Sequence, residues 1–284
     1  LNNIDILCIQ EHWLHEHNLH ILQDASPNHH VISKSSENLT NLNIIHGGRG
    51  KGGVAIYLRK SIISDFKRIT CQSSRILAVE ITFLQTLKRM LLINCYLPSG
   101  TNSSDLAEYQ ICLGIIGHLL DTHLPPGEQS TGVIAGDLNV DTVNQNTKKS
   151  LEYLRQLMIS WSLLSVTEAV CSREQYTFSS DDRKKKSNID GFLVPAAGIS
   201  QFENLTISEE EPLNTSDHYL VTTEYRLPQS YPLPKNSEMA NHRAKKSSRI
   251  KIKWEQVNNK EMRELYTCPL ELKAFELFKQ TLDC

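Results

Sequence analysis

Short apolar runs of strand length recur along the chain from residue 4 to residue 225, and polar segments separate them. Runs of this kind indicate strands that are buried on both faces of a sheet. They lie at residues 4–9, 54–58, 77–83, 90–96, 133–135, 189–194 and 219–225. The sequence therefore predicts a fold in which sheet dominates.

Two helices are expected between these strands, because apolar residues recur there at helical spacing. The first opens at Asp105, with Glu108 three residues later. Its apolar face holds Leu106, Tyr109, Leu113, Ile116 and Leu120. The second follows Thr147, and its apolar face holds Leu151, Leu154, Leu157, Trp161 and Leu164. Strands in excess of helices, with the helices in long connections, predict an α/β sandwich of two sheets flanked by helices.

The character of the chain changes at Leu227. Three prolines follow at positions 228, 232 and 234, and residues 241–249 are polar and basic without an apolar period. We expect a domain over residues 1–227, a basic linker over residues 228–250 and a tail over residues 251–284. Within that tail, residues 252–254 could begin another element.

Composition narrows the functional classes. The 284 residues are 39% apolar, which is enough for a globular core, and the net charge of -2 gives no overall signature of a polyanion-binding protein. Contact with nucleic acid would therefore need local basic patches and a bound cation. The seven cysteines are widely spaced without a CxxC pair, so we expect a reduced intracellular protein. No stretch approaches the length of a transmembrane helix, and we expect no membrane partner.

A glycine-rich segment at residues 48–53 satisfies the pattern GxGxxG. Dinucleotide binding needs a helix after this pattern, whereas the segment runs into the strand expected at residues 54–58. It also fails as a phosphate-binding P-loop, because Gly52 stands where that motif needs Ser or Thr. We interpret the segment as a loop before a strand.

Four histidines, His12, His15, His17 and His20, lie close together near the start of the chain. They do not form the zinc motif HExxH, because Leu19 stands where the second histidine is needed. A solvated, histidine-rich helix or loop is the favoured interpretation.

Chemically active side chains follow or precede several of the predicted strands. Glu11 follows the first run, Asp137 and Asn139 follow the run at residues 133–135, and Asp217 and His218 precede the last. Ser187 and Asp190 add a fourth group. Each group alone has a structural explanation, such as a turn or a cap. Together they can gather acids around a metal ion at one sheet edge, which indicates a metal-dependent phosphodiesterase.

In this order the segments resemble the endonuclease/exonuclease/phosphatase superfamily, whose fold is that of deoxyribonuclease I and the apurinic/apyrimidinic endonucleases. The ordered segments are residues 5–11, 52–57, 94–98, 136–139, 176–178, 187–190 and 216–218. Within the superfamily the chain most resembles the endonuclease domain of non-LTR (LINE-like) retrotransposon polyproteins, because the sequence Gly-Gly-Val-Ala-Ile-Tyr is typical there. The basic linker and tail also resemble the stretch that leads toward a reverse transcriptase.

The resemblance implies that water attacks a DNA phosphodiester and leaves a 3′-hydroxyl and a 5′-phosphate. It implies that Glu11 is the ligand of Mg²⁺, or of Mn²⁺, with Asp217 as a second acid of the metal site. Asp137 would deprotonate the water and Asn139 would hold its geometry. His218 would donate to the phosphate, and Asp190 would fix the tautomer of His218.

The resemblance also assigns roles to residues outside this acid and histidine set. Tyr96 would donate a hydrogen bond toward the phosphate or the leaving oxygen. A basic run directly before the Asp190 strand would contact phosphates, although a solvated loop is an alternative interpretation. The run comprises Arg183, Lys184, Lys185 and Lys186.

The chain departs from the family at its front, because the family begins with an Asn-bearing strand and a helix that this sequence lacks. With that first strand missing we expect an unpaired sheet edge, lower stability and weak activity. Three functions stay open: a nuclear, DNA-nicking endonuclease domain derived from a retrotransposon, a catalytically inactive remnant, and a phosphatase of the same fold.

Overall fold

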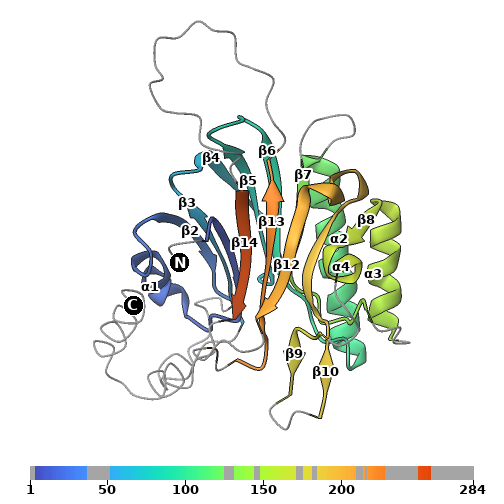
Figure 1. The fold of residues 1–284 in the computed structure, drawn as a ribbon. Helices are drawn as coiled ribbons and strands as arrows, with labels where there is room; N and C mark the ends of the chain where they lie inside the picture. The colour runs from blue at the N-terminus through green and yellow to red at the C-terminus, as the bar shows by residue number, and fades with distance from the viewer. Residues whose placement is uncertain are drawn as a thin grey trace, which may run out of the picture.

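The computed structural model describes residues 4–36, 52–124, 131–143, 148–170, 175–180, 184–208, 214 and 216–227, and the backbone of residues 249–256. Two six-stranded sheets lie face to face (Figure 1). The first sheet has the order β12 (Phe202–Ser208), β13 (Leu220–Arg226), β14 (Arg249–Gln256), β1 (Ile6–Gln10), β3 (Val54–Arg59), β2 (His29–Lys34). The second has the order β4 (Ile63–Ile69), β5 (Ile76–Phe83), β6 (Arg89–Tyr96), β7 (Thr131–Asp137), β11 (Asp190–Pro195), β8 (Leu163–Ser165). The predicted two-sheet sandwich is confirmed.

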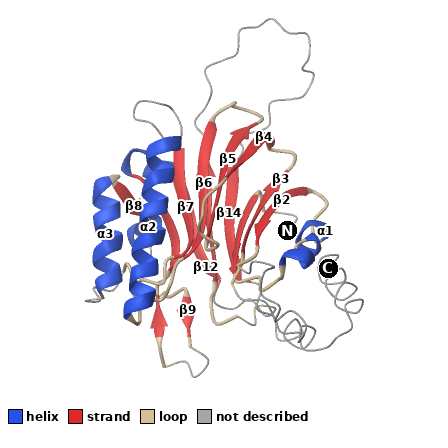
Figure 2. Ribbon diagram, turned by 180° about the vertical axis from the view of Figure 1, so that it is seen from behind, coloured by secondary structure: helices blue, strands red, loops and turns tan. Residues whose placement is uncertain are grey.

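Helices cover the outer face of the second sheet, as Figure 2 shows for α2 (Ser103–His123) and α3 (Lys149–Ser160). The short helix α1 (His20–Asp24) lies on the side of the first sheet, and α4 (Val166–Val170) follows β8. Two 3-10 helices lie at Glu16–Asn18 and Ala196–Gln201, and β9 (Phe178–Ser179) pairs with β10 (Lys186–Ser187) in a separate hairpin. In the described part of the chain, no helix combines the length and apolar character needed to span a membrane.

The central strands of the second sheet, β5, β6, β7 and β11, are buried on both faces, which explains their continuous apolar runs. In β5, Leu77, Val79 and Ile81 belong to the core between the sheets. The alternate residues Ile76 and Ala78 belong to the core under α2 and α3. Because successive strand residues point to opposite faces, both sets must be apolar.

Both predicted helices exist, but their ends differ from the prediction. The side chain of Asn102 accepts a hydrogen bond from the backbone N–H of Asp105 at 2.9 Å, so Asn102 caps α2 and the helix begins at Ser103. The helix α3 ends at Ser160, and Leu164 lies in β8 with 43% of its surface exposed. The placement of Leu164 on the apolar helix face is therefore wrong.

The strand β14 lies inside the first sheet. It runs parallel to β1 and antiparallel to β13, and β1 pairs on its other side with β3. The prediction of an unpaired edge beside the first apolar run is therefore wrong. β14 crosses the expected boundary between linker and tail at residue 250, and the division of the chain into domain, linker and tail stays a prediction.

Candidate active site

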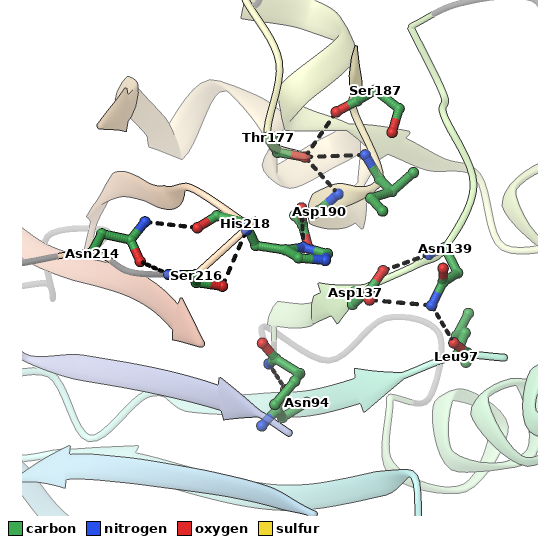
Figure 3. A network of polar contacts seen from close by, with 12 residues as sticks. Asn94, Leu97, Asp137, Asn139, Thr177, Ser187, Asp190, Asn214, Ser216 and His218 are labelled. Carbon is green, nitrogen blue, oxygen red and sulfur yellow. Dashed lines mark hydrogen bonds and ion pairs between the residues drawn. The ribbon is translucent and has the colours of Figure 1, made fainter. Parts of the chain in front are cut away.

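Strands from both sheets bring polar side chains to one end of the sandwich (Figure 3). Asp137 ends β7 and Asp190 begins β11, and the two residues are register partners in adjacent antiparallel strands. His218 lies two residues before the start of β13, a strand of the opposite sheet. Side-chain ligand atoms of these three residues all lie within 4.8 Å of one another. The fold thus gathers residues that are up to 81 positions apart in sequence (218 - 137).

A glycine is needed directly before Asp137. Gly136 has φ of 146°, and a Cβ atom at this position would overlap the backbone carbonyl of Cys95 in the neighbouring strand β6. Only glycine combines this backbone conformation with such a close approach. The strand β7 can therefore reach the site edge beside β6, and it places the buried Asp137 carboxylate there.

Asn139 holds the Asp137 carboxylate. Its backbone N–H donates to one carboxylate oxygen of Asp137 at 2.8 Å, and its Nδ2 donates to the other at 3.1 Å. The same Nδ2 donates to the carbonyl of Leu97 at 2.7 Å. Asn139 adopts a left-handed conformation with φ of 52°, which Asn tolerates better than most residues. Asn139 thus both forms the turn after β7 and fixes the orientation of the Asp137 carboxylate.

His218 and Asp190 form a buried pair. Nδ1 of His218 lies 2.9 Å from both carboxylate oxygens of Asp190, and the two side chains are 10% and 2% exposed. Burial alone would lower the pKa of His218, but the negative charge of Asp190 and its hydrogen bond raise that pKa to about 10. His218 is therefore an imidazolium at neutral pH, with Nδ1 engaged by Asp190.

The buried carboxylate of Asp137 lies near other negative charges. Burial and the nearby charge of Asp190 raise the pKa of Asp137 well above its usual value, although the charge of His218 opposes this shift. The charge of Glu11 also raises the pKa of Asp137. A carboxylate with a raised pKa is a better proton acceptor than an exposed one.

The loop before β13 is held by its own side chains (Figure 3). Asn214 accepts from the N–H of Ser216 at 3.0 Å and donates to the carbonyl of His218 at 2.7 Å. The hydroxyl of Ser216 accepts from the N–H of His218 at 3.1 Å. Asp217 is partly exposed, and its charge helps to raise the pKa of His218.

Thr177 positions Asp190, and the sequence interpretation assigned it no role. Its buried hydroxyl accepts from the N–H groups of Ile189 and Asp190, each at 3.1 Å, and donates to the carbonyl of Ser187 at 3.4 Å. The carbonyl of Thr177 accepts from the N–H of Tyr219, directly after His218, at 2.7 Å. The sequence signal that could have indicated a role for Thr177 is its place in the segment at residues 176–178, which is one of those that resemble the family.

Glu11 lies on the side of the site that belongs to the first sheet. It adopts φ of 54°, its N–H donates to the carbonyl of Gly53 at 2.8 Å, and Trp13 Nε1 donates to its carboxylate at 2.9 Å. Burial raises the pKa of Tyr96, and the charge of Glu11 and its hydrogen bond raise it further. Glu11 and Tyr96 are therefore neighbours, and Tyr96 stays a protonated hydrogen-bond donor.

A buried amide pair joins the two sheets behind Glu11. Gln10 in β1 donates from Nε2 to the side-chain oxygen of Asn94 in β6. Asn94 in turn donates to the carbonyls of Ile9 and Ala55, both at 2.9 Å. Both side chains are buried, and within the described residues the side-chain oxygen of Gln10 has no hydrogen-bond partner. The sequence analysis did not predict this hydrogen bond, because it interpreted the two segments as apolar strands.

The basic run lies partly in the hairpin of β9 and β10. Arg183 is outside the described residues, and Lys184, Lys185 and Lys186 are exposed. The ammonium of Lys186 lies 4.0 Å from the ring centroid of Tyr176 and contacts its hydroxyl. The hairpin adjoins the site, because the ring centroid of Phe178 lies 4.9 Å from that of His218. Phosphate contact by this run stays a prediction.

The prediction that His12 is solvated is wrong. His12 is 1% exposed, its Nδ1 accepts from the N–H of Leu14 at 3.1 Å, and its Nε2 lies 3.2 Å from the carbonyl of Lys34. Burial lowers the pKa of His12 to about 4. A Cβ atom on Gly53 would overlap the His12 ring, so this glycine gives room to a packed histidine. His17 and His20 are exposed, as expected.

Solved structures with the same fold include several DNA-processing enzymes. An AP endonuclease from Archaeoglobus fulgidus shares 18% identity, with a TM-score of 0.56 over 77% of this chain and 87% of that one. The 3′ phosphatase NExo from Neisseria, bound to a product DNA hairpin, shares 18% identity, with a TM-score of 0.56 over 78% and 89%. The endonuclease domain of TRAS1, a telomere-specific non-LTR retrotransposon, shares 12% identity, with a TM-score of 0.56 over 79% and 100%.

At these identities the structural likeness concerns the fold alone, and it agrees with the predicted deoxyribonuclease I-like sandwich. Among curated proteins, none matches this sequence. The family model for endonuclease/exonuclease/phosphatase proteins matches residues 1–218, a range that ends at His218 and includes every acidic residue of the site. The chain therefore belongs to the endonuclease/exonuclease/phosphatase family.

Proposed function

We propose that this chain is a divalent-metal-dependent endonuclease domain, derived from a retrotransposon, that hydrolyses DNA phosphodiesters and leaves a 3′-hydroxyl at the nick. The observation that carries the proposal is the buried pair of His218 and Asp190, which lies beside the Asp137 carboxylate. This arrangement offers a proton donor and a proton acceptor within a few ångströms, as in-line attack by water on a phosphate requires.

The charge balance of the site fits a divalent cation. Asp190 and Glu11 both raise the pKa of Asp137, which means that these carboxylates repel one another. Asp217 adds a further acid beside His218. We assign the ion to Glu11, with Asp217 as a second acid, because Mg²⁺ and Mn²⁺ prefer oxygen ligands. His218 is a poor ligand, since its Nδ1 is engaged by Asp190 and its ring is protonated. When bound, the cation would stabilise the negative charge that develops on the phosphate oxygens.

Each remaining residue has a role that follows from its contacts. Asp137, oriented by Asn139, takes the proton of the attacking water. His218 donates a hydrogen bond to the phosphate as negative charge develops, and Asp190 holds the ring in the required tautomer. Tyr96, protonated beside Glu11, donates toward the phosphate or the leaving oxygen.

DNA is the proposed substrate for two reasons. The exposed lysines of the hairpin adjoin His218 through Phe178, so they stand where the backbone of a long polyanion could be contacted. In addition, the proteins of like fold include AP endonucleases and a retrotransposon endonuclease domain. A phosphatase is the second candidate, because one protein of like fold is described as a 3′ phosphatase.

A plasmid assay tests the proposed function. Supercoiled DNA with Mg²⁺ should become a relaxed circle before any linear form appears, and a chelator should stop the reaction. The nick should prime a DNA polymerase directly, because its end is a 3′-hydroxyl. Release of phosphate from a 3′-phosphorylated oligonucleotide or an inositol phosphate, without nicking, would support the phosphatase. No turnover of either substrate would support an inactive remnant.

The metal assignment has its own matched pair of variants. Glu11→Gln removes the charge of the proposed ligand, whereas Glu16→Gln removes an exposed charge from the nearby 3-10 helix. Glu11→Gln should raise the Mg²⁺ concentration for half-maximal nicking about tenfold or more, the scale on which metal-site groups act. Glu16→Gln should leave it unchanged. Equal Mg²⁺ dependence of both variants would contradict the assignment of Glu11.

A further inference from the structure

The backbone of residues 249–256 occupies a central position in the first sheet. β14 runs parallel to β1, with Cys8 and Trp254 as register partners. It runs antiparallel to β13, with Val221 and Trp254 as register partners. Figure 1 shows β14 and β13 side by side in the sheet. The range matched by the family ends at residue 218, so β14 lies well outside it.

The alternation of residues in this segment suits the position. Ile250, Ile252 and Trp254 alternate with Lys251, Lys253 and Glu255, which is the two-residue period of a strand. The register places positions 252 and 254 beside Ile6 and Cys8, and both of these residues belong to the core between the sheets. The apolar positions 252 and 254 of β14 are thus the register partners of core residues of β1.

The two strands on either side of β14 lead to the two parts of the site that come from this sheet. Glu11 directly follows β1, and His218 lies two residues before the start of β13. Among the described strands, β1 and β13 are connected within the sheet through β14. Without β14, the facing edges of β1 and β13 would carry unpaired backbone N–H and C=O groups, and the spacing between Glu11 and His218 would lose its support.

We propose that residues 249–256 are a strand of the catalytic domain, which completes the first sheet and sets the distance between Glu11 and His218. The strand is a positioning element, because it acts through β1 and β13. Its placement is independent of the proposed function, whereas its effect on nicking rests on that function.

A cross-link in the full chain tests the placement. Cys8 is a free thiol, and neighbouring strands lie about 4.8 Å apart, within the Cα separation that a disulfide spans. Trp254→Cys should therefore form a disulfide with Cys8 in a glutathione redox buffer, detected as a linked peptide by mass spectrometry. Lys253→Cys is the matched control, because its register partner is Leu7 and not Cys8.

We expect at least about ten times more linkage to Cys8 from position 254 than from position 253, since register pairs share a face. Equal linkage from both positions, or none from 254, would overturn the proposal. Should Trp254→Cys unfold the chain, a second pair gives the answer. Thr223→Cys with Ile252→Cys, in a Cys8→Ala background, tests the antiparallel side, where these positions are register partners.

The effect on the site is tested by a second pair of variants at one position. Ile252→Pro removes a backbone donor from the middle of an internal strand, whereas Ile252→Val keeps a β-branched residue. Nicking should fall at least about tenfold for Ile252→Pro, with a lower melting temperature, and stay unchanged for Ile252→Val. Full nicking and melting temperature in Ile252→Pro would overturn the proposal. If the Trp254→Cys variant links to Cys8 but the wild type nicks no DNA, the proposed function fails and the strand placement stands.

Discussion

The two sheets contribute to the site in different ways. The second sheet supplies Asp137 and Asp190 from β7 and β11, which pair directly, so the ladder itself fixes their separation. The first sheet supplies Glu11 from the end of β1 and His218 from the loop before β13, and β14 separates these two strands. One half of the site thus depends on two adjacent strands, and the other half depends on a strand from residues 249–256. We therefore expect nicking to be lost in two ways: by substitution of a site residue in either half, or, for the half from the first sheet, also by disruption of β14.

Removing Asp137 should have the largest effect, because it takes away the proposed base, which lies in the half of the site held by two directly paired strands. Asp137→Ala should lower the nicking rate by about 10²- to 10⁴-fold, the usual contribution of general acid–base catalysis. The measurement is the initial rate of plasmid relaxation at saturating Mg²⁺. Asp121→Ala, an exposed acid on α2, is the control and should nick normally. A rate for Asp137→Ala within threefold of the wild type would remove Asp137 from the mechanism.

Removing His218 should have the next largest effect, and it tests the half that depends on the first sheet. His218→Ala should lower the rate by roughly 10²- to 10³-fold, since one donor to a developing oxyanion is lost. In the wild type the rate should also fall as the pH rises through about 10, because the raised pKa of His218 marks where this proton leaves. A gel-shift assay should show nearly unchanged DNA binding. Near-normal turnover by the variant would make His218 structural.

The pair of His218 and Asp190 spans the two halves, and its pH dependence has a definite sign. Since the pKa of His218 is raised in the folded protein, the pair stabilises the fold fully below the ordinary pKa near 6.5, and this stabilisation is lost as the pH rises through about 10. Asp190→Asn removes the charge that raises the pKa and leaves the burial that lowers it. The pKa of His218, followed by NMR, should therefore fall in this variant.

Urea unfolding gives a second measurement of the same pair. Between pH 6 and pH 10 the wild type should lose more stability than Asp190→Asn, because only the wild type carries the strongly raised pKa of His218. An unchanged pKa in the variant, or equal losses of stability in both proteins, would show that Asp190 does not set the protonation of His218.

The difference between the halves also explains how far the sequence could predict them. Four strands of the second sheet, β5, β6, β7 and β11, were found because they are buried on both faces and carry unbroken apolar runs, whereas the edge strands β4 and β8 were missed. The residues around Asp137 were found because the contacts of Asn139 are local in sequence. The resemblance to a family added roles to residues that spacing alone left open.

The features that were missed depend on distant parts of the chain. Nothing local shows that Gly53 makes room for His12, or that Asn94 meets Gln10 across the sandwich. The end of α3 was misplaced because helical spacing continues to Leu164, whereas Ser162 turns the chain with φ of 48°. β14 was missed as a central strand because its partners lie at residues 6–10 and 221–226.

A smaller effect is expected from the amide pair that joins the sheets behind Glu11. Asn94→Ala leaves the Gln10 amide and two backbone carbonyls without their buried partner, which should destabilise the fold by about 1–3 kcal/mol. The measurement is urea unfolding at pH 7. Ser64→Ala removes an exposed hydrogen bond from β4 and should cost less than about 0.5 kcal/mol. Equal stability of both variants would show that the link between the sheets contributes little.

The smallest expected effect lies outside both halves, in the hairpin of β9 and β10. Lys185→Ala should weaken DNA binding at low salt and reduce the slope of log K against log salt concentration by about 0.9, because one fewer counterion is released. Lys67→Ala on β4, an exposed lysine of the edge strand of the second sheet, is the control and should keep the slope. The maximal nicking rate should stay the same in both variants, because neither lysine touches Asp137 or His218 in the described contacts. If Lys185→Ala and the control have the same salt slope, the basic run is a solvated loop, and the phosphate contacts must come from the walls of the site itself.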